Sequence, residues 1–134
     1  MSAANPDEEL AALLRHLAPH RRPGQFVFCT VPQAPAGVEP LATIQEQEGL
    51  TVVVEKDVAD GAGLKYEFVA AMITLGVASP LHAVGLTAAV SAVLAHAGIS
   101  CNVMAGHFHD HLFVPVDRAE DTLDLLRQLS HRDL

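Results

Sequence analysis

The longest uncharged stretch of the chain, from Phe68 to His109, constrains the fold most, because it contains no Asp, Glu, Lys or Arg. A membrane hairpin is one way to place such a stretch. However, the helix expected between Pro80 and Gly98 would span only about 25 Å, whereas a bilayer core is about 30 Å thick. The N-terminus is acidic and lacks the positive charge and long apolar core of a signal peptide. We therefore expect a soluble cytoplasmic protein.

The same stretch begins a pattern of strand, helix, strand, hairpin and strand. Ile73, Leu75 and Val77 alternate as in a strand with one buried face, and Ser79-Pro80 ends it because proline restricts the residue before it. The next expected elements are a helix over 82–97, strands over 99–105 and 111–116 joined by a turn, and a final helix from Asp117. The order βαββα makes most of one ferredoxin-like unit.

The helix expected over 82–97 has two apolar faces and no charged side chain. One face should pack on the sheet and consists of Leu86, Val90, Val93 and Ala97. The opposite face would admit a second helix or subunit and consists mostly of small residues: Val84, Thr87, Ala88, Ser91 and Ala95. We expect burial on both faces, and burial on one face within a single domain is the alternative.

The first half of the chain predicts a helix, a strand and a hairpin. Asn5-Pro6 followed by three acids is a strong helix start, and the helix is expected to reach Leu17. Arg21 and Arg22 fall in a predicted solvated loop, with contact to an anionic ligand or acidic chain as the alternative. The later elements are a strand over 25–31, a hairpin over 41–46 and 50–55, and a short helix over 56–63.

A short internal sequence similarity predicts two related halves. Residues 51–60 (TVVVEKDVAD) align with residues 111–120 (HLFVPVDRAE), and both run from a strand through an acidic residue into a helix. The alternative explanation is that unrelated strand-to-helix connections share the same residue preferences. The first copy lacks a helix between its first two strands, and we expect the N-terminal helix to fill that gap. The predicted halves are 1–66 and 67–134.

The last strand and helix carry two further predictions. Pro115 cannot donate a hydrogen bond to a sheet, which favours an edge position or a bulge. Asp117 with Glu120 three residues later resembles a capping box at the start of the closing helix.

Charge and cysteine content exclude several classes of function. The net charge of −8 and the pI near 5.3 disfavour binding to nucleic acids and to anionic membranes. Cys29 and Cys101 lie in apolar sequence without zinc-like spacing, which favours buried free thiols and leaves one disulfide as the alternative.

The histidine-rich segment from Gly106 to His111 is the most visible candidate for chemistry. His107, His109 and His111 would share one face of a strand, so a metal site is an alternative. Gly106 predicts a turn, which would scatter the three rings, so we favour structural or hydrogen-bonding histidines and expect no metal. The sequence also contains no GxSxG, P-loop, HExxH or dinucleotide motif, so we expect neither catalysis nor a cofactor.

The loop from Ser79 to Gly85 is the remaining candidate site. It leads into a helix whose N-terminal amides would suit a carboxylate, and Ser100, Cys101 and Asn102 on the next strand would add polar contacts. The alternative is a plain helix start with Ser79 as the capping residue.

Several strings in the sequence resemble the ACT domain. They are Ile73-Thr74-Leu75, residues 83–91 (AVGLTAAVS), 98–103 (GISCNV), 28–31 (FCTV), 48–51 (EGLT) and 109–115 (HDHLFVP). Together they cover about residues 7–130 and resemble small stand-alone bacterial tandem ACT-like proteins, which are related to the regulatory region of aspartate kinases. His107 departs from the pattern, in which an aromatic residue is expected.

The resemblance implies an α+β fold of two ferredoxin-like βαββα units side by side, with a mainly antiparallel sheet and helices on one face. It also implies a non-catalytic regulatory module, a homodimer, and a small-molecule ligand, which in this family is often an amino acid. A metal-binding protein using the three histidines and a ligand-free dimerisation scaffold are the alternatives. The implied ligand residues are Ser79, Leu81, His82, Ala83, Val84, Gly85, Cys101, Asn102 and Val103.

Overall fold

A computed structural model describes residues 5–132 of the chain. The helices are α1 (Pro6–Arg15), α2 (Lys56–Gly61), α3 (Leu86–His96), the short 3-10 helix η1 (Val116–Arg118) and α4 (Ala119–Ser130). The strands are β1 (Pro19–Arg21), β2 (Phe26–Val31), β3 (Ala42–Glu46), β4 (Gly49–Glu55), β5 (Val69–Leu75), β6 (Asn102–Ala105) and β7 (Asp110–Pro115). None of the helices among these residues has the length and apolar character needed to cross a bilayer.

The strands form one antiparallel sheet in the order β3-β4-β2-β5-β7-β6, and β1 also pairs with β5. The predicted α+β fold with two ferredoxin-like units side by side is confirmed. The first unit lacks the helix between its first two strands, as the sequence predicted. The segment from Pro32 to Leu41 connects β2 to β3 there without a helix.

Each unit completes its sheet with a strand from the other half of the chain. In the second unit β1 lies beside β5, with Pro19 opposite Leu75 and Arg21 opposite Ile73. In the first unit the beginning of β5 lies beside β2, with Ala70 opposite Phe26. Because β1 and β2 share one edge of β5, this strand belongs to both units. The division at 66 and 67 therefore stays a proposal about the sequence halves.

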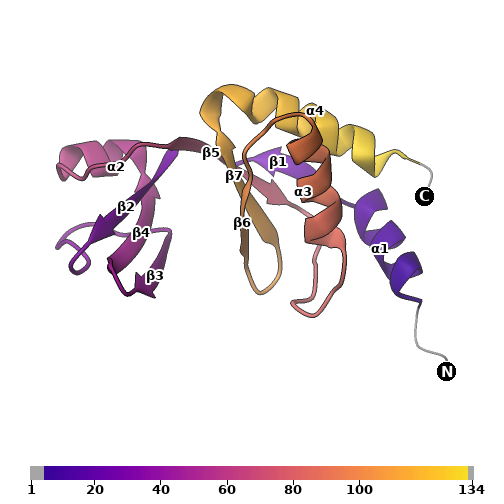
Figure 1. Cartoon of the computed structure of the whole chain (residues 1–134), viewed down its shortest axis with the longest axis horizontal. Helices are drawn as coiled ribbons and strands as arrows, with labels where there is room; N and C mark the ends of the chain where they lie inside the picture. The colour runs from indigo at the N-terminus through magenta and orange to yellow at the C-terminus, as the bar shows by residue number, and fades with distance from the viewer. Residues whose placement is uncertain (1–4, 133–134) are drawn as a thin grey trace.

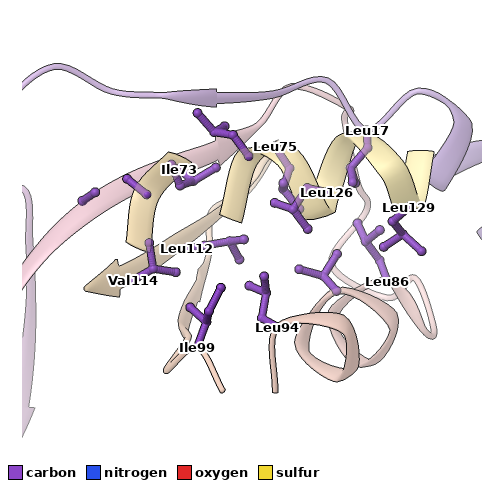
Figure 2. Packing of buried hydrophobic residues seen from close by; sticks show 14 of the residues in the cluster. Leu17, Ile73, Leu75, Leu86, Leu94, Ile99, Leu112, Val114, Leu126 and Leu129 are labelled. Carbon is purple, nitrogen blue, oxygen red and sulfur yellow. The ribbon is translucent and has the colours of Figure 1, made fainter. Parts of the chain in front are cut away.

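The sheet has its helices on one face and a second apolar core on the other. On the helical face of the second unit, side chains from β5, β7, α3 and α4 converge, including Ile73, Leu112, Leu94 and Leu126 (Figure 2). On the same face of the first unit α2 packs its buried Ala59 against β2 and β4. The opposite face holds Phe26, Val53, Ala70, Met72 and Phe113.

The sheet is strongly curled. Figure 1 shows β2, β3 and β4 on one side and β5, β6 and β7 on the other, with the helices outside the curl. The concave inner face carries no helix, so the curled sheet resembles half of a barrel.

The N-terminal helix does not fill the gap in the first unit, and that prediction was wrong. α1 lies beside α3 and α4 of the second unit (Figure 1). The leucine stripe explains this placement, because Leu14 and Leu17 are buried in the core beneath α3 and α4. Ala18, with φ of 48°, then turns the chain sharply into β1, a strand that the sequence analysis had treated as loop.

Helix α3 begins four residues later than predicted. Its N-cap is Gly85, with φ of 101°, and this left-handed backbone ends any helix that would start at His82. The alternative interpretation, with Ser79 as the capping residue, was therefore wrong. Asn5 does cap α1, because its side-chain oxygen accepts from the Asp7 amide at 2.8 Å.

The predicted capping box at Asp117 is also absent. Neither η1 nor α4 has a side-chain cap, and Arg118 instead binds Asp121 at 2.9 Å. Pro115 is the last residue of β7 and pairs with Ala70 of β5, whereas the pairing of β7 with β6 ends at Phe113. Pro115 therefore lies at a local edge of the sheet, as predicted. A terminal proline ends the ladder without breaking it.

Helix α3 buries one face within the chain. Leu86, Val90 and Leu94 are buried, whereas the predicted stripe members Val93 and Ala97 are only half-buried. The small-residue face, including Thr87, Ala88 and Ala95, is exposed. Burial of this second face therefore stays a prediction about assembly.

Candidate ligand-binding site

Two loops meet at the end of the second unit where α3 begins. One joins β5 to α3 (residues 76–85), and the other joins β6 to β7 (residues 106–109). The Ser79 amide donates to the Phe108 carbonyl at 2.9 Å. His109 Nδ1 lies 3.1 Å from the Val77 carbonyl oxygen. These two contacts hold the loops together and fix the approach to the helix.

A cavity of about 120 Å³ lies where the loops, α3 and the strand ends converge. It is small and comparatively enclosed. The lining residues are Ser79, Pro80, Leu81, Ala83, Gly85, Leu86, Thr87, Ala105 and Asp110.

The structure brings together four of the nine predicted ligand residues: Ser79, Leu81, Ala83 and Gly85. His82 and Val84 belong to the same loop but do not line the cavity, and the Val84 side chain is 76% exposed. Cys101, Asn102 and Val103 do not line it either. The β6 residue that does so is Ala105, because the start of α3 faces the end of β6 and not its beginning.

Gly85 leaves the N-terminus of α3 open toward this cavity. The first intrahelical bond runs from the Ala89 amide to the Gly85 carbonyl at 2.9 Å, so the amides of Leu86, Thr87 and Ala88 have no partner within the helix. As Gly85 has no side chain, no capping oxygen competes for these amides. The open amides and the helix dipole favour a negatively charged group here.

Asp110 is the site residue that the sequence analysis missed as a ligand contact. It begins β7 opposite Ala105 and is buried, with 9% of its surface exposed. Burial raises the pKa of its carboxyl group, while nearby His111 and His109 act in the opposite direction. The sequence did contain a signal for the burial of Asp110, because strand alternation places it on the same face as Leu112 and Val114, which are both buried.

The three histidines do not converge on a common point. His107 is exposed, His109 contacts the Val77 carbonyl, and His111 Nδ1 lies 3.0 Å from Thr74 Oγ1 on the opposite face of the sheet from Asp110. Burial, followed by the charge of Arg22, lowers the pKa of His111. Within residues 5–132, no group of three or more His, Cys, Asp or Glu side chains is placed to hold a metal ion. The geometry therefore favours hydrogen-bonding histidines.

The two cysteines are free thiols, as the sequence analysis favoured. Cys29 is buried in the first unit, and burial raises its pKa. Cys101 is half-buried, and burial raises its pKa to about 11. Thiols with raised pKa values are poor nucleophiles at neutral pH, so neither residue resembles a catalytic cysteine.

The site thus presents two complementary features across a short distance. The open amides of α3 suit an anion, and the buried carboxylate of Asp110 suits a cation or a hydrogen-bond donor. A ligand that carries both charges on neighbouring atoms would satisfy both.

Comparison with protein families gives two matches that together span most of the chain. A model of the ACT domain matches residues 6–71, and a second ACT-domain model matches residues 67–128. No curated protein sequence matches the chain significantly.

Several solved structures share the fold. A Vibrio cholerae protein of unknown function, described as a possible transport protein, is 42% identical with a TM-score of 0.85, over 95% of this chain and 100% of that one. The aspartate kinase regulatory subunit from Thermus thermophilus, in its ligand-free form, is 15% identical with a TM-score of 0.60, over 87% and 97%. Its counterpart from Thermus flavus is 15% identical with a TM-score of 0.58, over 84% and 96%.

Proposed function

The chain belongs to the ACT-domain family, whose members are small-molecule-binding regulatory modules, and we propose that this module binds an amino acid between Asp110 and the start of α3. The α-carboxylate of the bound amino acid would accept hydrogen bonds from the open amides of Leu86 and Thr87. Its α-ammonium would contact the Asp110 carboxylate. The burial of Asp110 beside an uncapped helix is the observation on which this proposal rests.

The energetics of Asp110 support a cationic ligand group. Burial disfavours the ionised carboxylate in the free protein, and no positively charged residue forms a salt bridge with it in residues 5–132. An ammonium group would supply the missing opposite charge in a partly desolvated site. The small cavity would accept the shared end of an amino acid, and the ligand's side chain would extend toward Leu81 and Thr87 at the opening.

The module is proposed to act without catalysis and as a homodimer. The two ACT-domain matches together cover residues 6–128, and the similarity to separate regulatory subunits supports a role in transmitting ligand binding. The exposed, uncharged face of α3, with Thr87, Ala88 and Ala95, would form the dimer contact. This face begins beside the ligand cavity, so dimerisation and ligand binding would affect each other.

The proposal is tested by thermal unfolding of untagged protein with each of the twenty amino acids, and with divalent metals in parallel. A ligand at about one hundred times its Kd adds about 2.7 kcal/mol, which raises Tm by roughly 8–10 °C for a chain of this length. We expect one or two amino acids to raise Tm and Asp110→Asn to remove that shift. Glu67→Gln, which neutralises an exposed acid outside the cavity, is the matched control.

Two results would contradict the proposal. An amino-acid shift that persists in Asp110→Asn would move the site elsewhere. The absence of any amino-acid shift, together with a response to zinc, would favour the histidine segment despite its geometry.

A further inference from the structure

A second, larger cavity lies on the concave face of the sheet. Its volume is about 560 Å³, and both edge strands of the sheet, β3 and β6, line it. No helix residue lines it, and Ala105, at the end of β6, lines both this cavity and the Asp110 cavity. The residues that define it here are Arg22, Ile44, Met72, Met104, His111 and Phe113.

The floor of this cavity is apolar and firmly packed. Met72 and Phe113 are buried, and the Phe113 ring meets the edges of Phe26 and Phe28 at centroid distances of 6.3 and 5.3 Å. The rim is also apolar but open, since Leu41 is 42% and Ile44 is 51% exposed. Large apolar residues around a hollow of this size are typical of small-molecule sites.

Arg22 is the only Lys or Arg among the residues that line the cavity, and it is exposed. The Arg22 amide donates to the Met72 carbonyl at 2.8 Å, which fixes the arginine backbone beside the floor. None of the salt bridges in residues 5–132 includes Arg22, although the chain has a net charge of −8. The Arg22 charge lies near enough to His111 to help lower its pKa.

The position of His111 at the cavity wall depends on Gly106. A Cβ atom on Gly106 would lie 3.2 Å from His111 Nε2 and 2.9 Å from the His109 carbonyl oxygen. On its other side the His111 ring contacts Thr74 Oγ1. The ring is therefore held between the sheet and a backbone segment that only glycine allows so close.

We propose that the concave face binds a small carboxylate with an apolar body. The carboxylate pairs with the Arg22 guanidinium, and the body packs on Met72, Met104 and Phe113. Charge complementarity selects this ligand class, because the Arg22 guanidinium, which forms no salt bridge within residues 5–132, borders a mostly apolar hollow. This site is separate from the proposed amino-acid site, because the two lie on opposite faces of the sheet.

The test compares 1-naphthylacetate with its neutral amide, 1-naphthylacetamide. The chain contains no Trp, so naphthyl fluorescence reports binding without interference from tryptophan. We expect the acid to bind about tenfold more tightly than the amide, as for a hydrogen bond to a charged group. Arg22→Gln should remove this difference, whereas Arg21→Gln, which removes the same charge from an exposed residue outside the cavity, should keep it.

A second pair of variants tests the rim. Ile44→Asp places a negative charge at the opening and should weaken binding of the acid by about tenfold. Thr43→Asp adds the same charge to the neighbouring exposed residue of β3, which does not line the cavity, and should change binding less than about twofold. Asp110→Asn should leave naphthylacetate binding unchanged, so failure of either site is recognised separately.

Three results would overturn the proposal. The first is equal binding of the acid and the amide, because Arg22 would then provide no selectivity. The second is a loss of acid binding in Arg21→Gln as large as in Arg22→Gln, which would indicate a general effect of net charge. The third is that neither probe binds; if Ile44→Asp, but not Thr43→Asp, then also converts a dimer to a monomer in sedimentation, a second copy covers the cavity.

Discussion

Replacing Gly85 by alanine tests how the start of α3 is built. Gly85 has φ of 101°, where L-residues are rarely found, and an added Cβ would lie 3.0 Å from Leu10 Cδ2 of α1. The backbone strain alone should cost about 1–2 kcal/mol. The contact should add roughly 0.5–1 kcal/mol, at the low end of overpacking because the Leu10 side-chain tip can shift. The sum corresponds to a decrease in Tm of roughly 5–10 °C.

Gly24→Ala is the matched control. Its φ of 92° carries a similar backbone strain, but nothing lies within 4 Å of an added Cβ. Urea unfolding followed by far-UV circular dichroism gives both free energies of unfolding, with unchanged m-values as the check on two-state behaviour. If Gly85→Ala is no less stable than Gly24→Ala, the contact between α1 and the α3 N-terminus is not significant. If neither variant loses stability, the backbone reasoning is refuted.

Two further predictions concern titrating groups. Because the pKa of Asp110 is raised in the fold, the folded state holds its proton to higher pH, so this residue reduces stability as the pH rises from the unfolded pKa of 3.8 through the folded pKa. Ligand-free Asp110→Asn should therefore have a higher Tm than the native protein at pH 7 but not below pH 3, and an equal or lower Tm at pH 7 would contradict the reasoning. Cys101, with a pKa of about 11, should react with iodoacetamide far more slowly at pH 7 than after unfolding in urea. Equal rates in the folded and unfolded protein would show that the thiol is accessible and unperturbed.

Local signals in the sequence predicted the elements that depend on neighbouring residues. Asn5 and Pro6 begin α1, and the hairpin of β3 and β4 forms where alternation and Gly49 predicted it. The resemblance to a known family supplied the arrangement of the two units. Neither signal predicted β1, because the three residues Pro19–Arg21 become a strand only when they pair with the distant β5.

The candidate site was predicted only in part, because it too combines local signals with contacts between distant segments. The loop that carries Ser79 and Gly85 was identified from proline, glycine and the helix that follows. The start of α3 was placed too early, because the left-handed backbone of Gly85 is not visible from composition. This shift moved the facing strand residue from Cys101 to Ala105, and Asp110, within the histidine-rich segment, was not predicted as a ligand contact.

The exchange of strands between the units has a consequence for how the protein is made. α1 and β1 are synthesised before β5, α3 and α4, which provide the surfaces that bury them. The Ser130 hydroxyl near the end of α4 donates to the Arg15 carbonyl, joining residues 115 positions apart. Such contacts can form only after almost the whole chain has closed into a loop. Until then they do not stabilise the fold, and the leucine stripe of the N-terminal segment stays exposed to water. Folding of the second unit, and of the site within it, is therefore completed by a segment that was synthesised before the rest of that unit.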